Sequence, residues 1–487
     1  MTGGLLELVA KGSQDIFLTG NPSVTFFKSI YKKHTNFSFE SVQQSMVGDQ
    51  NFGKLLNCKI ERKGDLLSGI TLEIDLPLIE SENHDENLEW IDSIGHYIIE
   101  EVSINVGEQE IDKQYGEWME IWNELTLNEE HSSGYKQMVG KTGTNIKDKT
   151  TLIIPLQFWF CRNIGSALPL IALQYHEVKL FLKLRNFEDL WHQDIVSFNV
   201  SRSTTGVIEI KDSNSISNFE NNMPAKYYPG ISIIWKDNLE ENKILIENDA
   251  LVYVNNDNND NIKFKLVDTS YTKKNGEIYI IKFKPIKPEK IEDIRIFCDY
   301  IYLDVAERKY FAKNSHNYLI EQIQFNGVDD YKKGTITLKS DLEFNHPCKE
   351  IIWVNQLKIN NKLNQLNNYS NGVIVNDNMN NNDTIEDAIL MVNGQDRFIK
   401  RKGKYFRLLV PYQRHTRTPD KYIYVYSFAL NPEQIQPSGS CNFSRLDNSE
   451  LLINMKTDTQ DSQLRVYATN YNILKIINGM GGLAYSN

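Results

Sequence analysis

The sequence predicts an all-β protein built from two similar modules in tandem. Apolar and polar residues alternate in short runs, as from Glu101 to Val106, and this is the period of a half-buried strand. Turn-forming pairs such as Gly64-Asp65 separate the runs. The length of 487 residues suffices for two or three domains of about 150 residues each. Short strands between such turns favour a sandwich or a barrel.

Three short helices are expected to interrupt the strands. Asn21 opens the first, in which aromatic and aliphatic residues recur at spacings of three and four as far as Tyr31. In the second, residues 118–125 place their apolar side chains on one stripe. The third begins at Asp304, because an acidic N-cap followed three residues later by Glu307 is typical of a capping box.

Two stretches of the chain, residues 255–261 and 360–383, are rich in asparagine. Stretches of this composition bury little apolar surface. We therefore expect both of them to be exposed loops.

Four segments of the first half recur in the same order in the second half. They are Lys28–Phe37 with Arg308–Tyr318, the turn at Gly107 and Gly116 with the turn at Gly394 and Gly403, the aromatic strand Phe158–Phe160 with Tyr424–Phe428, and Ile294–Tyr300 with Leu464–Tyr471. The offset between the copies falls before the last segment, which indicates an insertion of about a hundred residues in the first copy. Two related β modules therefore follow one another along the chain.

This repeat predicts the domain organisation. Residues 1–26 form an N-terminal arm, 27–304 a first module with a large insertion at about 186–292, and 305–487 a second module. Each module is long enough to bury its own core. An eight-stranded jelly roll, in which two sheets pack together, suits this length and strand density. The polar start of the arm has few residues typical of a core, so we expect it to order on assembly.

Composition and charge narrow the function classes. Hydrophobic residues make up 40% and charged residues 24%, which is ordinary for a globular protein and excludes a disordered or fibrous chain. Lys and Arg number 53 against 64 Asp and Glu, a net charge of −11, whereas wrapping DNA requires an excess of basic residues. No apolar run is long enough for a membrane-spanning helix. The N-terminus also lacks the basic and apolar regions of a signal peptide.

The cysteines are scattered along the chain and form no CxxC pair. They are Cys58, Cys161, Cys298, Cys348 and Cys441. Their spacing supports neither a zinc ribbon nor a redox motif. We expect reduced, buried thiols, which fits synthesis in a reducing cytoplasm.

No pattern typical of a catalytic, cofactor or metal site is found in the sequence. The histidines form neither HxH nor HExxH, and no GxSxG elbow occurs. The segment Gly134–Thr142 resembles a phosphate-binding loop, but five residues instead of four separate its glycines. We therefore expect a flexible polar loop at this position, and no enzyme activity, cofactor or metal.

One cluster of basic residues stands out, interleaved with Phe398, Tyr405 and Phe406. Its members, called the basic cluster below, are Arg397, Lys400, Arg401, Lys402, Lys404 and Arg407. On an acidic chain such a cluster could dock an anionic partner, either a protein or a membrane. We predict inter-subunit or inner-layer contacts at this cluster. The alternative is a solvated loop.

The chain contains Asn-x-Ser/Thr sequons, which are candidate glycosylation sites. They are Asn36, Asn199, Asn368, Asn382 and Asn442. A sequon accepts a glycan only where the chain meets a glycosylation pathway. Because the chain is rich in asparagine and has no secretory signal, these sequons are expected to arise by chance.

Several segments spread over the whole chain carry a resemblance to one known family. They are Ala10–Asp15, Leu18–Pro22, Thr25–Lys28, His34–Phe37, Ala167–Val178, Tyr300–Asp304, Asn345–Pro347, Gln436–Arg445, Asn470–Asn472 and Gly479–Tyr485. As a set they resemble the major capsid proteins of the nucleocytoplasmic large DNA viruses, in the manner of algal and protist giant viruses. The insertion and the Asn-rich stretches lie outside the resemblance. In this family such loops decorate the outer surface.

The resemblance implies a double jelly roll that forms homotrimers. Two modules in each of three chains give six similar barrels, hence a pseudo-hexagonal capsomer that tiles an icosahedral shell. The implied partners are neighbouring capsomers, penton and minor capsid proteins, and an internal membrane, with no direct contact to nucleic acid. The chain would then belong to the virion capsid, assembled in the host cytoplasm, and would have no catalytic residues.

Two alternatives to a major capsid protein stay open at this point. A minor capsid paralogue would have the same fold and the same motifs. A glycan-binding jelly-roll protein, as among the lectins, is the other; such sites often add calcium ligands or an exposed aromatic cluster, and neither can be located in the sequence.

Overall fold

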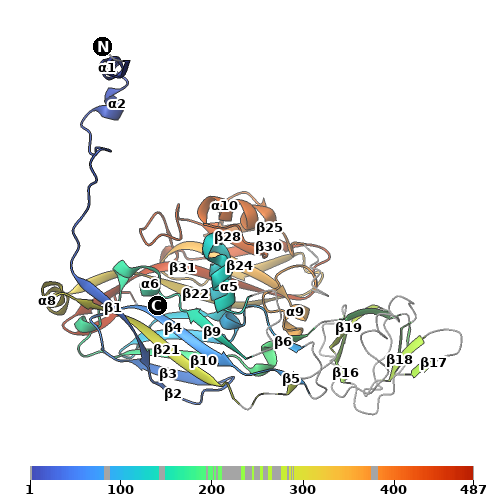
Figure 1. Cartoon of the computed structure of the whole chain (residues 1–487). Helices are drawn as coiled ribbons and strands as arrows, with labels where there is room; N and C mark the ends of the chain where they lie inside the picture. Colours follow the sequence, from blue (N-terminus) through green and yellow to red (C-terminus); the bar gives the residue numbers. More distant parts are fainter. Residues whose placement is uncertain are drawn as a thin grey trace. The chain divides into compact units, whose positions relative to one another are not determined.

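Residues 39–487 contain two sets of paired β-sheets (Figure 1). The computed structural model describes residues 3–81, 88–141, 149–193, 288, 290–373 and 382–485, and between 196 and 286 the backbone of the strands named below. The chain divides into two units, residues 1–38 and 39–487, and each is described by itself.

The first set of sheets makes up the first jelly roll. Its four-stranded sheet has the order β1 (Phe37–Gln44), β21 (Asp293–Leu303), β4 (Leu66–Leu76) and β9 (Thr150–Pro155). Its second sheet has the order β2 (Met46–Val47), β3 (Leu55–Ile60), β10 (Val178–Leu184), β7 (Ile99–Val106) and β8 (Gln109–Tyr115). In β7 the buried Val102, Ile104 and Val106 alternate with more exposed neighbours, as the sequence predicts, except that Ser103 is also buried.

The second jelly roll has the same construction. One sheet has the order β22 (His316–Tyr331), β31 (Ser462–Ile477), β24 (Pro347–Leu357) and β28 (Ile423–Ser427), with β29 (Cys441–Asn442) on β24 and β32 (Met480–Leu483) on β31. The other has the order β23 (Thr337–Asp341), β30 (Ser449–Met455), β25 (Ile385–Val392) and β26 (Gln395–Asp396), with β27 (Arg401–Lys402) on β25.

The two jelly rolls match strand for strand. The order β1-β21-β4-β9 corresponds to β22-β31-β24-β28, and β3-β10-β7-β8 corresponds to β23-β30-β25-β26. The matched strands number eight in each jelly roll, four in each of its two sheets, which is the jelly-roll arrangement. The repeat read from the sequence thus corresponds to a repeat of the fold.

Additional strands lie between β10 and β21 of the first jelly roll, where the second has only residues 456–461. They form two four-stranded sheets. One has the order β12 (Val196–Val200), β19 (Gly276–Ile281), β15 (Ser232–Trp235) and β16 (Ile244–Leu245). The other has the order β13 (Arg202–Thr204), β14 (Val207–Ile210), β18 (Asn261–Lys265) and β17 (Tyr253–Asn255). Two short pairs flank them, β6 (Leu88–Trp90) with β11 (Trp191–Gln193) and β5 (Glu80–Ser81) with β20 (Pro285–Ile286). All but β5 and β6 lie within the range in which the sequence predicts the insertion.

Short helices connect the strands. They are α3 (Ile94–Tyr97), α4 (Gly116–Thr126), α5 (Glu129–Met138), α6 (Trp159–Arg162), α8 (Val305–Lys313), α9 (Lys358–Lys362) and α10 (Val410–Arg414), with single turns η1 (Ile164–Ser166), η2 (Leu170–Ala172), η3 (Phe187–Asp189), η4 (Tyr405–Leu409) and η5 (Phe443–Arg445). None of the described helices is long and apolar enough to cross a membrane.

Two of the three predicted helices are confirmed. The apolar stripe at residues 118–125 lies on α4. Helix α8 follows Asp304, whose side chain accepts a hydrogen bond from the backbone N–H of Val305 at 2.8 Å. The helix predicted from Asn21 to Tyr31 is wrong, because this segment contains only turns and extended chain. Its aromatic residues are exposed among the residues that the structure describes, with Phe27 at 99%, so no tertiary packing stabilises a helix there.

Two further local predictions fail. Residues Phe158–Phe160 are not a strand: three consecutive side chains are buried there, and the chain turns into α6 after β9 ends at Pro155. The true counterpart of β28 is β9. The polar loop expected at Gly134–Thr142 begins inside helix α5, which ends at Met138.

The second Asn-rich stretch is folded and largely buried as far as residue 373, so its prediction as an exposed loop is wrong. The side-chain N–H groups of Asn368 donate to Gln365 Oε1 at 3.0 Å and to the Gly372 carbonyl at 2.9 Å. Asn364 donates to the carbonyl of Trp191 at 2.8 Å. Buried amides are tolerated because they are hydrogen-bonded. Residues 374–381, and 256–260 of the first stretch, lie outside the described residues.

The N-terminal unit consists of α1 (Gly3–Val9), α2 (Ile16–Thr19) and a following segment without regular structure as far as β1. The apolar side chains that are more than half exposed in it are Leu5, Leu6, Leu8, Val9, Ile16, Phe17, Leu18, Val24, Phe26, Phe27, Ile30 and Tyr31.

Candidate functional site: the junction of the jelly rolls and the exposed surface

Helix α4 follows the first jelly roll's strand β8 but packs into the core of the second jelly roll. Trp118, Ile121, Trp122 and Leu125 are at most 5% exposed and belong to that core. The ring of Trp118 lies 5.6 Å from the ring of Tyr467 on β31. Because these residues recur at spacings of three and four, one whole face of the helix is buried across the junction.

A glycine begins the helical segment at the same place in both jelly rolls. A Cβ at Gly116 would lie 2.2 Å from the carbonyl oxygens of His96 and Ile99, and a Cβ at Gly403 would lie 2.7 Å from that of Ile385. Ile99 and Ile385 are the first residues of the equivalent strands β7 and β25. Only glycine allows the backbones to approach so closely, which explains this repeated feature of the sequence.

Glu117 extends from α4 to the second jelly roll. Its Oε2 lies 2.7 Å from Nε of Arg465 and accepts a hydrogen bond from the hydroxyl of Tyr467 at 2.6 Å. Its Oε1 accepts one from the hydroxyl of Tyr369 at 3.1 Å. Burial would lower the pKa of Arg465, but the Glu117 carboxylate raises it above its usual value. The Arg465 guanidinium therefore stays charged although it is buried.

Glu120, one turn further along α4, is the centre of a second buried group of charges. Its carboxylate lies 2.7 Å from each of three nitrogens, Nζ of Lys421, Nζ of Lys141 and Nδ1 of His96. Burial would raise the pKa of Glu120, but the two ammonium groups and His96 hold it well below its usual range. Lys141 also pairs with Glu124. Lys141 of the segment that resembles a phosphate-binding loop is thus paired with carboxylates inside the molecule.

The C-terminal segment Gly479–Tyr485 packs against the first jelly roll. A Cβ at Gly479 would lie 2.7 Å from the ring of Tyr175, and a Cβ at Gly481 would lie 2.7 Å from the side chain of Leu173. Nδ1 of His176 lies 2.9 Å from the carbonyl oxygen of Gly481. Two segments that carry the family resemblance therefore contact each other across the junction, and the close approach explains their glycines.

Three other resembling segments meet at β24. Pro347 and Cys348 on this strand are paired with Asn442 and Cys441 on β29. On the opposite side Cys348 is paired with Asn470 on β31. Segments that are far apart in the sequence thus form one continuous piece of sheet, and this accounts for their occurrence as a set.

Comparison of the sequence with known families gives two matches. A family model described as large eukaryotic DNA virus major capsid protein matches residues 307–482, and one described as major capsid protein N-terminus matches residues 25–231. The chain belongs to the major capsid proteins of large eukaryotic DNA viruses.

Full-length relatives are similar along the whole capsid protein. The major capsid protein of Pyramimonas orientalis virus is 36% identical and that of Phaeocystis pouchetii virus 35% identical, each with 100% of both chains covered. The solved structure of the PBCV-1 capsid protein VP54 has a TM-score of 0.65 and 27% identity, covering 95% of this chain and 100% of VP54. The chain is therefore a structural component of a virion capsid.

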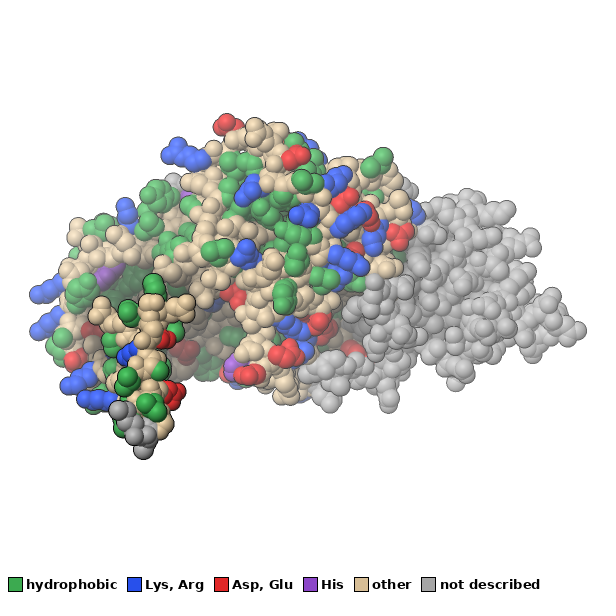
Figure 2. Space-filling view, turned by 90° about the horizontal axis from the view of Figure 1, so that it is seen from above, with side chains coloured by type: hydrophobic (Ala, Val, Ile, Leu, Met, Phe, Trp, Pro, Cys, Tyr) green, Lys and Arg blue, Asp and Glu red, His purple; other side chains and the backbone are tan. Residues whose placement is uncertain are grey.

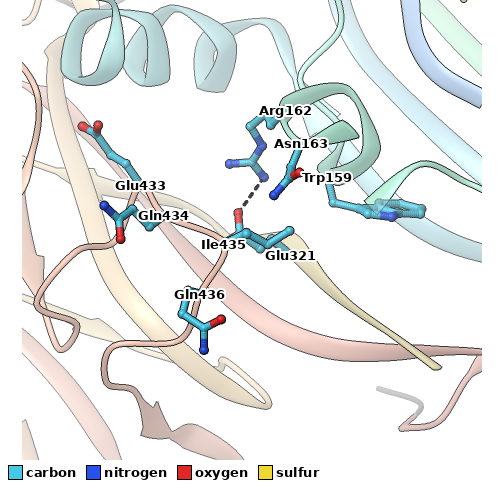
Figure 3. Close-up of a pocket in the computed structure, with 8 residues that line it drawn as sticks. All are labelled: Trp159, Arg162, Asn163, Glu321, Glu433, Gln434, Ile435 and Gln436. Atoms are coloured by element: carbon cyan, nitrogen blue, oxygen red, sulfur yellow. Dashed lines mark ion pairs between the residues drawn. The ribbon is translucent and has the colours of Figure 1, made fainter. Parts of the chain in front are cut away.

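The capsid protein has a pocket of about 390 Å³ where the two jelly rolls meet (Figure 3). Its lining includes Trp159 and Arg162 of α6, Glu321 of β22, and the segment Glu433–Gln436. Arg162 and Glu321 point toward one another, 3.1 Å apart. Glu321 also accepts a hydrogen bond from the buried ammonium group of Lys349. The charges of the pocket are paired within the chain, and the described residues contain no cluster suited to a metal ion.

A buried histidine fixes one wall of this pocket. His415 lies 3.0 Å from Glu350 through Nε2 and 3.0 Å from Glu433 through Nδ1. Burial would lower the pKa of His415, but these two carboxylates raise it to about 9. The imidazole is therefore cationic at neutral pH and holds the segment that carries Glu433.

The six residues of the basic cluster lie along one segment at the surface, but acidic neighbours neutralise half of them. Lys400 lies 3.5 Å from Asp387, Lys402 pairs with Glu386, and Nε of Arg407 lies 2.8 Å from Asp383. On the face of the molecule seen in Figure 2, basic, acidic and hydrophobic side chains are likewise interspersed.

Arg397, Arg401 and Lys404 are the remaining members of the basic cluster. All three are exposed and form no ion pair within the part of the chain that the structure describes. The guanidinium of Arg401 lies 5.1 Å from the ring centre of Tyr405. Ile399, which lies between Arg397 and Arg401 in the sequence, is 84% exposed. The surface available to a partner is therefore smaller and more apolar than the sequence suggests.

The candidate glycosylation sites differ in accessibility. Asn36, Asn382 and Asn442 are exposed. Asn368 is 4% exposed and its amide is hydrogen-bonded, so the folded chain cannot present it to an enzyme. The side chain of Asn199 on β12 lies outside the described residues.

Proposed function

We propose that three copies of this major capsid protein form a pseudo-hexagonal capsomer and that such capsomers tile an icosahedral shell. The equivalence of the two strand orders within one chain carries the proposal, because three chains then present six similar barrels. Closed cyclic symmetry is the usual form of homo-oligomers. The buried ion pairs of α4 support it further, because they fix the two barrels of one chain to each other.

The exposed surface supports lateral contacts in such a shell. Leu408, Leu409 and Tyr412 are exposed on successive turns of η4 and α10. They lie close in sequence to Arg401 and Lys404 of the basic cluster, which form no ion pair with the described residues. Apolar and arginine side chains are enriched where protein surfaces meet, so we assign inter-subunit or inner-layer contacts to this region.

The mass of the purified protein tests the capsomer. Size-exclusion chromatography with light scattering is expected to give a species of about 169 kDa, three times the chain mass of 56.4 kDa. The trimer should persist on dilution from micromolar to nanomolar concentration. A species of one chain mass at micromolar concentration would contradict the proposal.

We extend the proposal to the surroundings of the capsomer. Penton and minor capsid proteins and an internal membrane are its partners beside neighbouring capsomers, assembly takes place in the host cytoplasm, and the role is structural without catalysis. The net charge of −11 supports a shell that does not itself bind nucleic acid. Cross-linking and mass spectrometry of purified virions should recover peptides of this chain joined to penton and minor capsid proteins, and none joined to nucleic acid.

The proposed domain organisation of the shell protein stays as the sequence predicts it. It comprises an arm at 1–26, a first jelly roll at 27–304 with the insertion at about 186–292, and a second jelly roll at 305–487. The starts of the two matched family models at residues 25 and 307 support these boundaries. Limited proteolysis should release the insertion before it cuts either jelly roll.

A further inference from the structure

Two cysteines that are far apart in the sequence face each other on neighbouring strands. Cys348 on β24 and Cys441 on β29 are directly opposed partners in an antiparallel pair. Directly opposed Cα atoms lie about 4.5–5.5 Å apart, and a disulfide spans about 4.4–6.8 Å. Opposed side chains share one face of a sheet. Both cysteines pack against the core of the second jelly roll.

We propose that Cys348 and Cys441 form an intramolecular disulfide when the folded protein meets an oxidised thiol such as glutathione disulfide. Both are free thiols in this structure. The backbone already holds them in register, so bond formation requires only a small closing of the two Cβ atoms. Strand β29 has two residues and, among the described strands, pairs only with the start of β24, so it can make this movement without disturbing the main sheet.

The exposure of the two thiols sets the order of the reaction. Cys441 is half-buried and reacts first, whereas Cys348 is 0% exposed. The Cys441 thiolate attacks one sulfur of glutathione disulfide, whose S–S bond breaks and releases one glutathione thiolate. Cys348 then attacks the Cys441 sulfur, and its proton goes to the second glutathione, which leaves as a thiol. Two protein thiols are oxidised to one disulfide, and glutathione disulfide is reduced to two thiols.

The environment makes this reaction slow and dependent on the compartment. Burial raises the pKa of both thiols above the usual value, so little thiolate is present at neutral pH. A reducing cytoplasm keeps the pair reduced. If the proposed shell function holds, the bond would form after a particle leaves that compartment.

The disulfide would fix the surface segment between β28 and β29. This segment carries Pro432, whose carbonyl accepts a hydrogen bond from Lys349 at 2.6 Å, and Glu433, which pairs with His415. Its two ends are held by β28 and by the short β29. Closing the second end covalently should reduce local opening of the pocket wall.

The other three cysteines serve as internal references. Cys58 and Cys298 are at most 1% exposed in the first core, and Cys161 packs against the same core. In the described sheets Cys58 is opposed by Leu180 and Met46, and Cys298 by Ile70. None of these three is opposed by another cysteine there.

The test uses the full chain, purified under reducing conditions and then exposed to glutathione disulfide. The reaction is stopped with N-ethylmaleimide in denaturant, and free thiols are counted. The count is expected to fall from five to three. Digestion without reductant should give one cross-linked peptide pair that contains Cys348 and Cys441. Dithiothreitol should reverse both results, and the oxidised chain should have a higher Tm than the reduced chain.

Two variants make the test specific. Cys441→Ser is expected to keep all four of its remaining thiols and to show no rise in Tm on oxidation. The matched Cys161→Ser should fall from four thiols to two. Five free thiols in the oxidised, cooperatively melting wild type would overturn the proposal. So would a linkage between other cysteines, or a glutathione adduct on Cys441 with Cys348 left free. These readouts do not depend on trimer or shell formation, so they are independent of the proposed function.

Discussion

Glu117 and Arg465 form a buried ion pair, with 2.7 Å between the carboxylate Oε2 and the guanidinium Nε, that joins α4 to β31. One partner follows the first jelly roll in the chain and the other belongs to the second. Each side chain is 11% exposed, so water screens the pair only weakly. The pair fixes how the two jelly rolls sit against each other, which a capsomer of six similar barrels requires.

Removing one charge of this pair should destabilise the protein strongly. Arg465→Met leaves the Glu117 carboxylate buried without its cation, and a loss of about 3–5 kcal/mol is expected. The double variant Glu117→Gln with Arg465→Met should lose less than either charge-removing single variant, because no unpaired charge remains. The Tm from thermal unfolding measures both effects.

A surface pair provides the control for this prediction. Lys402 and Glu386 also form an ion pair, but their side chains are 71% and 44% exposed. Lys402→Met should change the Tm little, because water screens an exposed ion pair and makes its net contribution small. Equal Tm losses for Arg465→Met and Lys402→Met would show that the buried pair does not hold the junction together.

The glycines that begin the helical segments are expected to be irreplaceable. Gly116→Ala would place a Cβ 2.2 Å from two carbonyl oxygens, so α4 must shift away from the first jelly roll. We expect a large loss of Tm or failure to fold. Gly403→Ala, with 2.7 Å to one carbonyl oxygen, should show a smaller loss. Gly134→Ala is the matched control: it lies inside helix α5 with nothing near its Cβ, so it should stabilise by about 0.5–1 kcal/mol.

A buried carboxyl at the junction should make stability depend on pH. Asp112 of β8 accepts a hydrogen bond from the backbone N–H of Ile323 on β22 at 3.1 Å. Burial raises the pKa of Asp112 from 3.8 to about 7, although hydrogen bonds from Gln114 and Ile323 oppose the shift. The folded state therefore binds this proton more tightly than the unfolded state. The resulting stabilisation is complete below about pH 4 and is lost as the pH rises through about 7.

The comparison that isolates this effect is Asp112→Asn, whose side chain keeps the acceptor for Ile323 but cannot ionise. Between pH 4 and pH 8 the unfolding free energy of the wild type should fall relative to that of the variant by an amount on the order of 4 kcal/mol. The Tm of the wild type should fall with it. Asp458→Asn at an exposed position should show no such difference. A pH profile of the wild type that runs parallel to that of Asp112→Asn would refute the assignment.

The sequence determines the jelly rolls well because their signals are local and repeated. Alternation in β7, the stripe of α4, the Asp304 cap and the order of the repeated segments each depend on a few neighbouring residues. The buried charges are harder to predict. Glu117 and Glu120 lie on a helix whose other face is apolar, which is a usable signal. Their partners Arg465 and Lys421 lie several hundred positions away and are brought near only by the fold.

Several of the failed predictions have one physical cause, which is that composition does not reveal burial. The Asn-rich stretch at 360–373 looks solvated, but hydrogen bonds such as those of Asn368 satisfy its amides inside the protein. The aromatic residues at 26–31 have helical spacing, but no apolar face accompanies them. The cysteines look unrelated in sequence, yet the register of β24 and β29 places Cys348 opposite Cys441.

Charge reversal should separate the free members of the basic cluster from the paired ones. Arg397→Glu, Arg401→Glu and Lys404→Glu together are expected to impair assembly, while the Tm of the variant stays near that of the wild type because none of the three has an ion pair to lose within the described residues. Size-exclusion chromatography reports on the capsomer, and electron microscopy reports on shells.

A variant of equal charge change controls for the altered net charge. This control combines three substitutions at exposed positions outside the cluster, Lys332→Glu, Lys333→Glu and Lys475→Glu. If this control impairs assembly as much as the reversal in the cluster, net charge alone is responsible. If neither does, the cluster is a solvated loop, as the alternative interpretation of the sequence holds.

Deleting residues 1–18 should spare the capsomer but impair shell formation. The segment belongs to a unit of its own, and its apolar side chains are exposed, with Phe17 at 92% and Leu18 at 86%. Exposed apolar side chains in this number indicate a partner surface that forms only on assembly. The truncated chain should therefore form the same trimer in solution as the full chain, with the mass lowered only by the deleted residues, but few closed shells by electron microscopy. Replacing the segment with a Gly/Ser-rich stretch of equal length should reproduce the defect, because length is restored and apolar surface is not. Normal shells from both variants would show that the arm has no part in assembly.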